Sequence, residues 1–542
     1  MIRLTEIKLP LAHPNTAIAE AVVRTLGIQA NELQSVTIFK LSFDARKADL
    51  LQVYIVDVAL ASDALEVEVL HRFESNPHVR PTPDMAYKPI AAAPENLKSR
   101  PVVVGFGPCG IFAALVLAQM GFKPIVLERG KKVRERTKDT WNLWRKNQLH
   151  PESNVQFGEG GAGTFSDGKL YSQIKDPRHL GRKVMQEFVK AGAPEEILVD
   201  AHPHIGTFKL VKVVEHLREQ IIALGGEVRF EQRVTDVQIE HGQLQGLTVL
   251  DVATQQSYEL PTQQAVLALG HSSRDTFAML YERGVYVEAK PFSIGFRIEH
   301  PQSLIDRARW GRHAGHPLLG AADYKLVHHA KNGRAVYSFC MCPGGTVVAA
   351  TSEVGRVVTN GMSQYSRNER NANAGIVVGI TPEDFPSKHP LAGIELQRTL
   401  ESAAYVLGGS TYEAPGQLVG DFVKGIASTA LGSVEPSYKP GVKLVDLAAL
   451  LPSYAIEAIR EAIPAFGKKI KGFDLPDAVL TGVETRTSSP IKMTRGEDFQ
   501  SLNVRGLFPA GEGASYAGGI LSAGVDGIKV AEAVALSLLN QD

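Results

Sequence analysis

A glycine motif between a strand-like segment and an apolar helix-like segment constrains this chain more than any other feature. The sequence GFGPCG follows a short apolar run and opens an apolar stretch of helical length. In such a turn, Gly105 permits the tight bend, Gly107 lets the backbone approach a pyrophosphate, and Gly110 allows close packing of helix on strand. The helix N-terminus adds free N–H groups and a partial positive charge.

An acidic residue follows at the distance that this motif needs. Glu128 ends the strand-like run 123–128, 18 positions after Gly110. An acid at this place binds ribose hydroxyls in dinucleotide-binding units. The set of strand, glycine turn, helix, strand and acid therefore predicts a parallel sheet that binds a dinucleotide, and an ordinary tight turn is the alternative.

A second glycine cluster, GEGGAG at 158–163, fits the same spacing but lacks the flanking elements. It follows the polar stretch HPESNVQF and precedes TFSDGKLYSQ. We interpret it as a loop whose backbone donors suit a phosphate or a planar ring. The alternative is a flexible surface loop, against which Phe157 and Phe165 argue.

A third cluster lies near the end of the chain. Residues 507–513, LFPAGEG, predict a short strand and a glycine-rich turn, and Gly518 and Gly519 precede a helix that runs to about Leu539. The positive end of that helix suits an anionic reduced flavin. An ordinary glycine-rich turn is again the alternative.

Composition excludes several classes of protein. Lys plus Arg and Asp plus Glu both total 58 in 542 residues, so the chain is not a general polyanion binder. Apolar residues make up 44% and charged residues 21%, as in globular proteins. We expect no membrane span, no secretory signal and, from three cysteines, a cytoplasmic location.

Changes in pattern along the chain predict its domains. A small N-terminal α/β domain is expected, followed by a connector rich in Pro, Ala and Asn that begins near residue 75. The boundaries we predict are 1–85 for the N-terminal domain, 86–100 for the linker, 101–286 and 475–542 for the two parts of a nucleotide-binding domain, and 287–474 for an inserted domain.

Longer segments resemble a known family. They are NVQFGEGGAGTFSDGKL (154–170), AHPHIGT (201–207), LALGHSSRDTF (267–277), PFSIGFRIEHPQ (291–302), YSFCMCPGGTVV (337–348) and FPAGEGASYAGGILSAGVDG (508–527). They are similar to the bacterial FAD-dependent dehydrogenases also called NAD(FAD)-utilising dehydrogenases. That family lies within the flavoprotein superfamily of glutathione reductase and p-hydroxybenzoate hydroxylase. Here Leu269 replaces the Thr of the superfamily's Ala-Thr-Gly strand, and Glu512 replaces its usual Asp.

The resemblance implies FAD as cofactor and an α/β fold. That fold has a Rossmann-like, discontinuous FAD-binding domain, an inserted α+β substrate domain and a small N-terminal α/β domain. The expected FAD-binding residues are Gly105, Gly107, Pro108, Gly110, Glu128, Arg129, Gly160, Gly161, Gly163, Thr164, Ser166, Asp167, Gly168, Val234, Gly270, Gly511, Glu512, Gly518, Gly519 and Ile520. No second strand–GxGxxG–helix unit occurs between residues 171 and 500, so NAD(P)H would have to bind transiently near the flavin.

Three residues are candidates for catalysis. Lys169 could stabilise negative charge on reduced flavin, or it could be a surface lysine. Cys340 and Cys342 could form a redox dithiol or supply a nucleophile, or they could pack as two small side chains on one strand face. A metal at this pair or at His202 and His204 is disfavoured, because further ligands at metal-site spacing are missing.

A polar run follows the strand that resembles Ala-Thr-Gly. His271, Arg274 and Asp275 could line the junction of cofactor and substrate. The alternative is a helix start, with Ser272 or Ser273 as its N-cap.

Three functions follow from these observations. The first is an FAD-dependent oxidoreductase that transfers hydride or electrons through flavin N5 to or from a small organic substrate. The second is a flavoprotein that acts on RNA through residues 1–85 and the segment 40–47. Nine Lys or Arg against twelve Asp or Glu in residues 1–95 disfavour it. The third is a flavin-binding sensor without turnover.

Overall fold

The computed structural model describes residues 1–46 and 49–540, and the chain divides into two compact units. The first unit holds residues 1–88 and 173–204, and the second holds 89–172 and 205–542. Lys47, from the segment weighed as an RNA contact, lies outside the described residues. Within the described part, no helix combines the length and apolar character that crossing a membrane requires.

The first unit is an antiparallel sheet with helices, as the N-terminal sequence predicts. Its strands run in the order β2-β3-β1-β4. On β3, every second side chain is buried, from Gln52 to Leu60, which is the pattern of a sheet with one face on a core. The elements are β1 (Ile2–Pro10), α1 (Ala17–Leu26), β2 (Leu33–Asp44), β3 (Leu51–Leu60), α2 (Asp63–Arg72) and β4 (Val79–Pro81).

One boundary in this unit differs from the prediction. Strand β4 pairs with β1 inside the predicted domain 1–85, although its segment is rich in Pro and Asn. Residues 173–204, expected within the nucleotide-binding domain, group with the N-terminal residues and contain α5 (Leu180–Lys190). The Leu41 N–H donates to the Val199 carbonyl at 2.8 Å, so this later segment extends the edge of the sheet at β2. Pairing between such distant segments leaves no local trace in the sequence.

The second unit contains the predicted parallel sheet. Its strands run in the order β22-β11-β5-β6-β7, so the last strand in the chain joins the first ones. The strands are β5 (Val102–Val104), β6 (Ile125–Glu128), β7 (Glu227–Phe230), β11 (Ala265–Leu267) and β22 (Leu507–Pro509). This arrangement confirms the discontinuous domain, because residues about 400 positions apart share one sheet.

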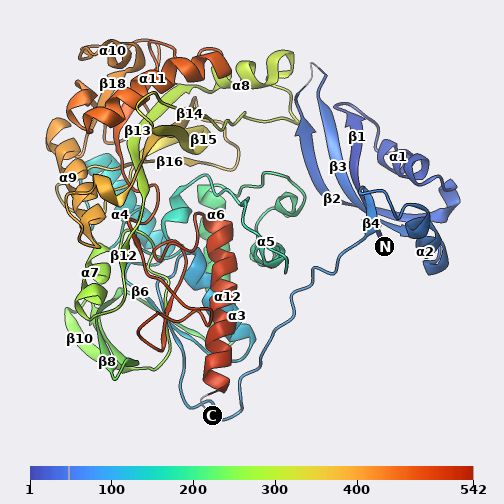
Figure 1. Ribbon diagram of the computed structural model, residues 1–542, viewed down its shortest axis with the longest axis horizontal. Helices are drawn as coiled ribbons and strands as arrows, with labels where there is room; N and C mark the ends of the chain where they lie inside the picture. The colour runs from blue at the N-terminus through green and yellow to red at the C-terminus, as the bar shows by residue number, and fades with distance from the viewer. Residues whose placement is uncertain (47–48, 541–542) are drawn as a thin grey trace. The chain divides into compact units, whose positions relative to one another are not determined.

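Two apolar helices pack side by side beside this sheet (Figure 1). They are α3 (Pro108–Gln119) and α12 (Ile520–Leu539), and the side chains of α3 are buried all round, as expected for a core helix. A Cβ atom at Gly527 would lie 2.3 Å from the Cys109 carbonyl oxygen, so the contact of the two helices requires glycine there. The other helices of this part are α4 (Val133–Lys146), α6 (Thr207–Ala223) and α7 (Arg274–Glu282).

A small antiparallel sheet and a strand pair complete the nucleotide-binding part. A hairpin turns at His241 and Gly242, and a third strand extends it in the order β10-β9-β8. These strands are β8 (Gln232–Glu240), β9 (Gln243–Asp251) and β10 (Gln256–Pro261), and the separate pair is β12 (Glu288–Ala289) with β21 (Ile491–Lys492).

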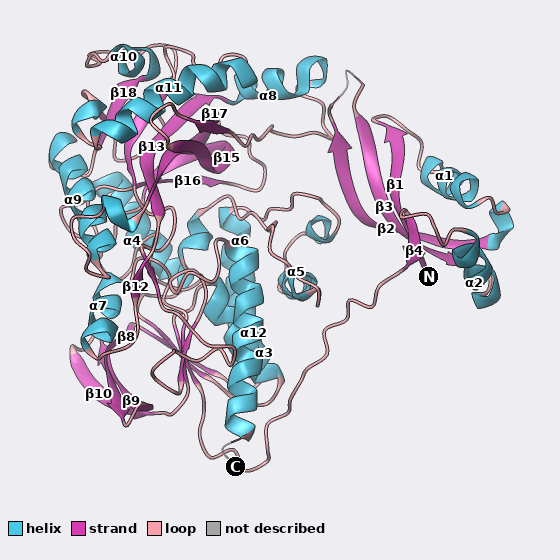
Figure 2. Cartoon of the chain, viewed as in Figure 1, coloured by secondary structure: helices cyan, strands magenta, loops and turns pink. Residues whose placement is uncertain are grey.

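The inserted part is a large, mostly antiparallel sheet around which helices group (Figure 2). Its strands are β13 (Phe292–Pro301), β14 (Val327–His329), β15 (Ala335–Ala349), β16 (Thr359–Ser363), β17 (Asn371–Ile380), β18 (Ala414–Leu418), β19 (Val442–Leu444) and β20 (Val479–Glu484). Its helices are α8 (Gln302–Trp310), α9 (Ala392–Leu407), α10 (Val419–Lys424) and α11 (Ser453–Lys469). Because β20 pairs with β13, the sheet extends past residue 474, where the sequence suggests that the insertion ends.

Candidate functional site

The three glycine clusters meet at one cavity of about 540 Å³ in the second unit. The first turn, the second glycine loop and the turn before α12 each contribute residues to its wall. Residues 324–325, 338–341 and 360 of the inserted part line it as well. The volume lies within the range of about 300–1,000 Å³ that is typical of ligand sites. The cavity therefore lies where the nucleotide-binding part and the inserted part meet.

The first two glycine clusters touch backbone to backbone. A Cβ atom at Gly161 would lie 2.8 Å from the Gly107 Cα, a distance that a side chain cannot tolerate. Gly105 has a φ of +100°, which favours glycine strongly, and the space behind Gly110 is filled by the Gly105 carbonyl oxygen, only 1.9 Å from where a Cβ would be. The second cluster is therefore part of the cavity wall, and the alternative of a flexible surface loop is wrong.

Glu128 holds the glycine loops in place as well as lining the cavity. Its Oε1 accepts the N–H groups of Gly130 and Gly158 at 2.9 and 3.0 Å, and its Oε2 accepts the Phe106 N–H at 2.9 Å. Only 5% of this residue is exposed. The carboxylate thus satisfies three backbone donors from three loops, a structural task beyond the ribose contact that its position predicts.

Arg136 on α4 supports the second loop, and nothing in the sequence marks it. The guanidinium is fully buried and donates to the carbonyls of Asn154, Val155 and Glu159 at 2.7 Å each. Burial lowers the pKa of Arg136 to about 10. In the sequence it looks like any other charge on an amphipathic helix. Its role follows only from the loop that folds over it.

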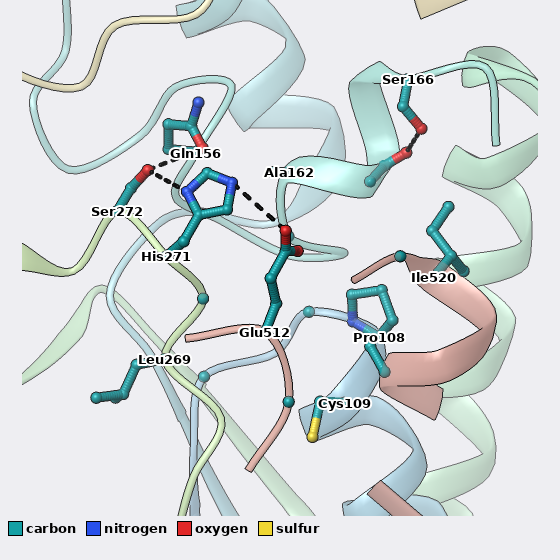
Figure 3. Close-up of a pocket in the computed structure, with 18 of the residues that line it drawn as sticks. Pro108, Cys109, Gln156, Ala162, Ser166, Leu269, His271, Ser272, Glu512 and Ile520 are labelled. Carbon is teal, nitrogen blue, oxygen red and sulfur yellow. Dashed lines mark hydrogen bonds and ion pairs between the residues drawn. The ribbon is translucent and has the colours of Figure 1, made fainter. Parts of the chain in front are cut away.

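A polar chain crosses the cavity wall near His271 (Figure 3). The Ser272 hydroxyl donates to Gln156 Oε1 at 3.0 Å and accepts from Arg486 at 3.0 Å. Its single proton is then used, so His271 Nδ1, 3.1 Å away, must donate to it. This assigns the Nδ1–H tautomer and leaves Nε2 as an acceptor, 3.9 Å from Glu512 Oε1.

Burial disfavours the charged form of both groups at this point. It lowers the pKa of His271 to about 3, and the charges of Arg486 and Arg274 act in the same direction. Burial also raises the pKa of Glu512 to about 7. At neutral pH a neutral imidazole therefore faces a carboxyl that is close to half protonated. Such a pair can hold or release a proton at the cavity wall.

The polar run after β11 contains both a helix start and one residue of the cavity wall. Helix α7 begins at Arg274, and Ser273 precedes it without making a side-chain cap. Its hydroxyl donates instead to the Leu269 carbonyl at 2.8 Å. Asp275 pairs with Arg129 at 2.8 Å. Of the three polar residues predicted at the junction, His271 lines the cavity, whereas Arg274 and Asp275 do not line it and form ion pairs with other side chains.

A buried ionic cluster stands behind Arg486. Glu401 on α9 is fully buried and accepts from Arg274 at 2.7 and 2.9 Å, from Arg486 at 3.1 Å and from the Thr485 hydroxyl at 2.8 Å. Burial alone raises the pKa of Glu401, but Arg274 and Arg486 outweigh it and hold that pKa well below its usual range. This cluster links α7, α9 and the segment after β20, so it fixes the cavity wall.

Lys169 reaches from the second loop region to the inserted sheet. Its Nζ donates to the Met341 carbonyl on β15. Burial lowers the pKa of Lys169, yet Asp167, Tyr171 and the two cysteines together outweigh burial and the pKa is raised. Asp167 itself is buried and pairs with Arg367 at 2.9 Å. Lys169 is therefore a charged group in the cavity wall, and the alternative of a plain surface lysine does not describe it.

The two cysteines of the inserted sheet are placed differently from each other. A β-bulge lies between Phe339 and Cys342, and Cys340 has a φ of +44°. Cys340 lines the cavity, whereas Cys342 is fully buried and does not. Simple alternation along a strand predicts equal placement on one face, and the bulge is the reason that this fails.

Most residues expected to bind the cofactor line the cavity. Those that do are Gly105, Gly107, Pro108, Glu128, Arg129, Gly161, Gly163, Ser166, Asp167, Gly168, Val234, Gly270, Gly511, Glu512, Gly518, Gly519 and Ile520. Three of the expected residues do not line the cavity. Gly110 packs against the first turn. Gly160 packs against Thr164 and Val214, and the Thr164 hydroxyl accepts a hydrogen bond from Arg136. The sequence did not single out Gln156, Tyr324, Ser338 or Asn360, which lie outside the glycine clusters.

Metal ligands do not gather at the positions that we considered. His202 and His204 belong to the first unit, and the described residues hold no group of three or more His, Cys, Asp or Glu side chains placed to bind a metal ion.

Comparison with known proteins identifies the family. Residues 291–487 match a family described as "FAD-dependent protein, C-terminal domain-like", and residues 1–59 match a domain of unknown function (DUF8436). An uncharacterized protein of Clostridium beijerinckii is 47% identical over 534 residues, which cover 98% of both chains. The first of these matches coincides with the inserted sheet, from just before β13 to just after β20.

Solved structures resemble the chain only loosely. A flavoprotein/dehydrogenase from Cytophaga hutchinsonii is 14% identical, with 82% of this chain and 79% of that chain covered and a TM-score of 0.36. The fumarate reductase subunit FrdA of E. coli is 12% identical, with 82% and 71% covered and a TM-score of 0.37. Superpositions this loose define no activity for the chain.

The cavity suits the cofactor that the family match names. Glycine backbones and the N-termini of α3 and α12 border it, and these bind phosphates without side-chain cations. Glu128 stands at the end of β6, where a ribose-binding acid belongs. The cofactor is FAD, and the chain belongs to a family of FAD-dependent proteins that includes the Clostridium beijerinckii protein.

Proposed function

We propose that this protein is an FAD-dependent oxidoreductase that transfers hydride or electrons to or from a small organic substrate. One observation carries the proposal: a single cavity is shared by the FAD-binding glycine clusters and by β15 and β16 of the inserted sheet. A protein that only stored or sensed flavin would not need a second domain to complete its cofactor cavity. Substrate would bind on the side of the inserted sheet.

The protein's own groups would divide the work between binding and proton handling. Backbone N–H groups of the glycine clusters and the two helix N-termini hold the phosphates, and Glu128 orients the ribose. Glu512, with its pKa near 7, and the acceptor Nε2 of His271 hold or move a proton at the wall. Lys169 supplies positive charge beside the inserted sheet. When bound, FAD supplies the redox chemistry through its ring.

Anaerobic reduction of the purified holoprotein tests this proposal. We expect NADH or NADPH to bleach the oxidised-flavin absorbance, although no second nucleotide-binding unit was predicted. A set of small oxidised organic acceptors is then added, and one of them should restore the absorbance catalytically. The acceptor that restores the flavin absorbance fastest is the best candidate for the substrate.

A matched variant separates this chemistry from free flavin in solution. Gly161→Val places a side chain against the Gly107 backbone, so the variant should lose FAD and show no turnover. Catalytic flavin reduction by that variant would contradict the proposal. So would a wild-type holoprotein whose flavin no nicotinamide or small organic compound reduces or reoxidises, because a sensor without turnover behaves in that way.

A further inference from the structure

Two free thiols meet in the wall of the cavity. The Cys342 thiol donates to the Cys340 carbonyl oxygen at 3.4 Å, so the two cysteines lie together in the same bulge. Both cysteines are free, and they differ in access, since Cys340 lines the cavity and Cys342 is fully buried. One reachable thiol with a shielded thiol two residues away is the arrangement of a nucleophile and a resolving partner.

The surrounding residues hold this short segment in a fixed shape. The buried Arg297 donates to the Cys340 carbonyl at 3.0 Å, and Lys169 donates to the Met341 carbonyl. Glycine at position 361 makes room for the second thiol, because a Cβ there would lie 3.0 Å from the Cys342 Sγ. Two cations and a glycine thus support the turn that holds the two cysteines.

The same contacts make the two thiols chemically unequal. The hydrogen bond from Cys342 is the main cause that lowers the pKa of Cys340 to about 6, and the charges of Arg297 and Lys169 add to it against the effect of burial. That hydrogen bond and burial raise the pKa of Cys342. Cys340 is therefore largely a thiolate at neutral pH, which is the reactive form.

Backbone geometry permits the two sulfur atoms to bond. Even in an extended strand, residues two apart have Cα atoms only roughly 6.6 Å apart, at a rise of about 3.3 Å per residue, and the bulge at Cys340 does not lengthen that span. Disulfides span Cα separations up to about 6.8 Å. Closure therefore needs only small adjustment within the bulge.

We propose that Cys340 and Cys342 form a redox-active dithiol that reduces small-molecule disulfides at the cavity. The Cys340 thiolate attacks one sulfur of a disulfide R–S–S–R, which forms a mixed disulfide and releases RS⁻. Cys342 then gives up its proton and attacks the Cys340 sulfur, which releases the second RS⁻ and leaves the Cys340–Cys342 disulfide. The small disulfide gains two electrons and the protein dithiol loses two.

Two electrons and two protons reopen the protein disulfide. Reduced flavin in the same cavity is a donor of two electrons and protons, and this step alone rests on the proposed function. The exchange with a small disulfide needs only the protein's own thiols, so the two parts can fail separately.

Thiol counting on the holoprotein with 4,4′-dithiodipyridine tests the exchange. The wild type should release two thiopyridones per chain and become lighter by two hydrogens, with no adduct in the intact mass. Cys342→Ser should release one and keep a thiopyridyl adduct on Cys340, and Cys340→Ser should release none on the same timescale. Cys109→Ala serves as the matched control: Cys109 also lines the cavity, but burial raises its pKa and keeps it a thiol, so this variant should behave as the wild type.

The pH profile and peptide mapping show whether the contact between the thiols matters. The rate for the wild type should rise with a midpoint near pH 6, and Cys342→Ala should move that midpoint up by more than one unit. A stable single adduct on wild-type Cys340, an unshifted midpoint in Cys342→Ala, or equal release from Cys340→Ser and wild type would each overturn the dithiol.

Anaerobic titration with dithionite tests the link to the flavin. Holoprotein that carries the disulfide should consume four electrons per chain, and Cys340→Ser should consume two, which is the capacity of the flavin alone. If the wild type and Cys340→Ser consume the same number of electrons, electron exchange with the flavin is refuted. The thiol counting then decides the thiol–disulfide exchange by itself. Retained flavin absorbance in Cys340→Ser shows that cofactor binding itself is intact.

Discussion

Replacement of Glu128 tests the claim that one carboxylate holds two glycine loops in place. In Glu128→Ala, the N–H groups of Phe106, Gly130 and Gly158 all lose their acceptor. An unpaired buried donor costs about 1–3 kcal/mol, and cavity water can replace part of that loss. We therefore expect the free energy of unfolding to fall by roughly 3–6 kcal/mol.

Glu128→Gln should cost less, for a geometric reason. An amide oxygen in the place of Oε1 still accepts the Gly130 and Gly158 N–H groups. The amide nitrogen then faces the Phe106 N–H, donor against donor, at the position where Oε2 accepted. One bond is lost and the other two lose charge assistance, so we expect about 2–3 kcal/mol.

Two measurements check this prediction. Denaturant unfolding of the FAD-free variants gives the stability order wild type, Gln, Ala, and fluorescence titration should give the same order for FAD affinity. Glu95→Gln, at an exposed carboxylate, should change neither by more than about 0.5 kcal/mol. Equal losses in the two Glu128 variants, or losses below about 0.5 kcal/mol in both, would refute the bracing role.

Three further predictions concern the rest of the cavity. Because the pKa of Glu512 is raised to about 7, its protonated form favours the fold, and the free energy of unfolding should decrease as pH rises from about 4.5 to 7. FAD affinity measured by titration should weaken above pH 7, and Glu512→Gln should remove that dependence; a variant with the wild-type profile would contradict it. Gly110→Ala should abolish FAD binding, since its Cβ would lie 1.9 Å from a backbone oxygen, whereas Ala114→Gly on the same helix should retain binding in the same assay. Glu401→Gln should lower the free energy of unfolding by about 3–5 kcal/mol, because two buried arginines lose their negative partner. Glu395→Gln, at an exposed position of the same helix, should leave it unchanged. Equal denaturation midpoints for Glu401→Gln and the wild type would contradict this prediction.

Local patterns predicted the parts of this fold that short segments encode. The strand, turn, helix and strand at 102–128 stand as expected, because a buried parallel strand and a core helix are apolar throughout and the turn needs glycine. The helix that runs to Leu539 after Gly518 and Gly519 is confirmed for a similar reason. Each of these signals lies within about thirty residues of sequence.

Pairings between distant segments could not be read in the same way. Residues 173–204 join the N-terminal unit, and β20 joins the inserted sheet, both across the boundaries that composition suggested. The backbone N–H and C=O groups of a strand edge can pair with any other strand, whatever its sequence. Which strand becomes the partner therefore depends on the assembled fold.

The sequence by itself determined the cofactor site: three glycine clusters and an acid at the right spacing, because close backbone approach tolerates no other residue. Only the tertiary structure decided what surrounds that site. It buried Arg136 and Glu401 as supports, set Glu512 against His271, and used a bulge to place Cys340 in the cavity and Cys342 behind it. Burial and long-range contact give charged and thiol side chains their properties, and neither is written in the residues next to them.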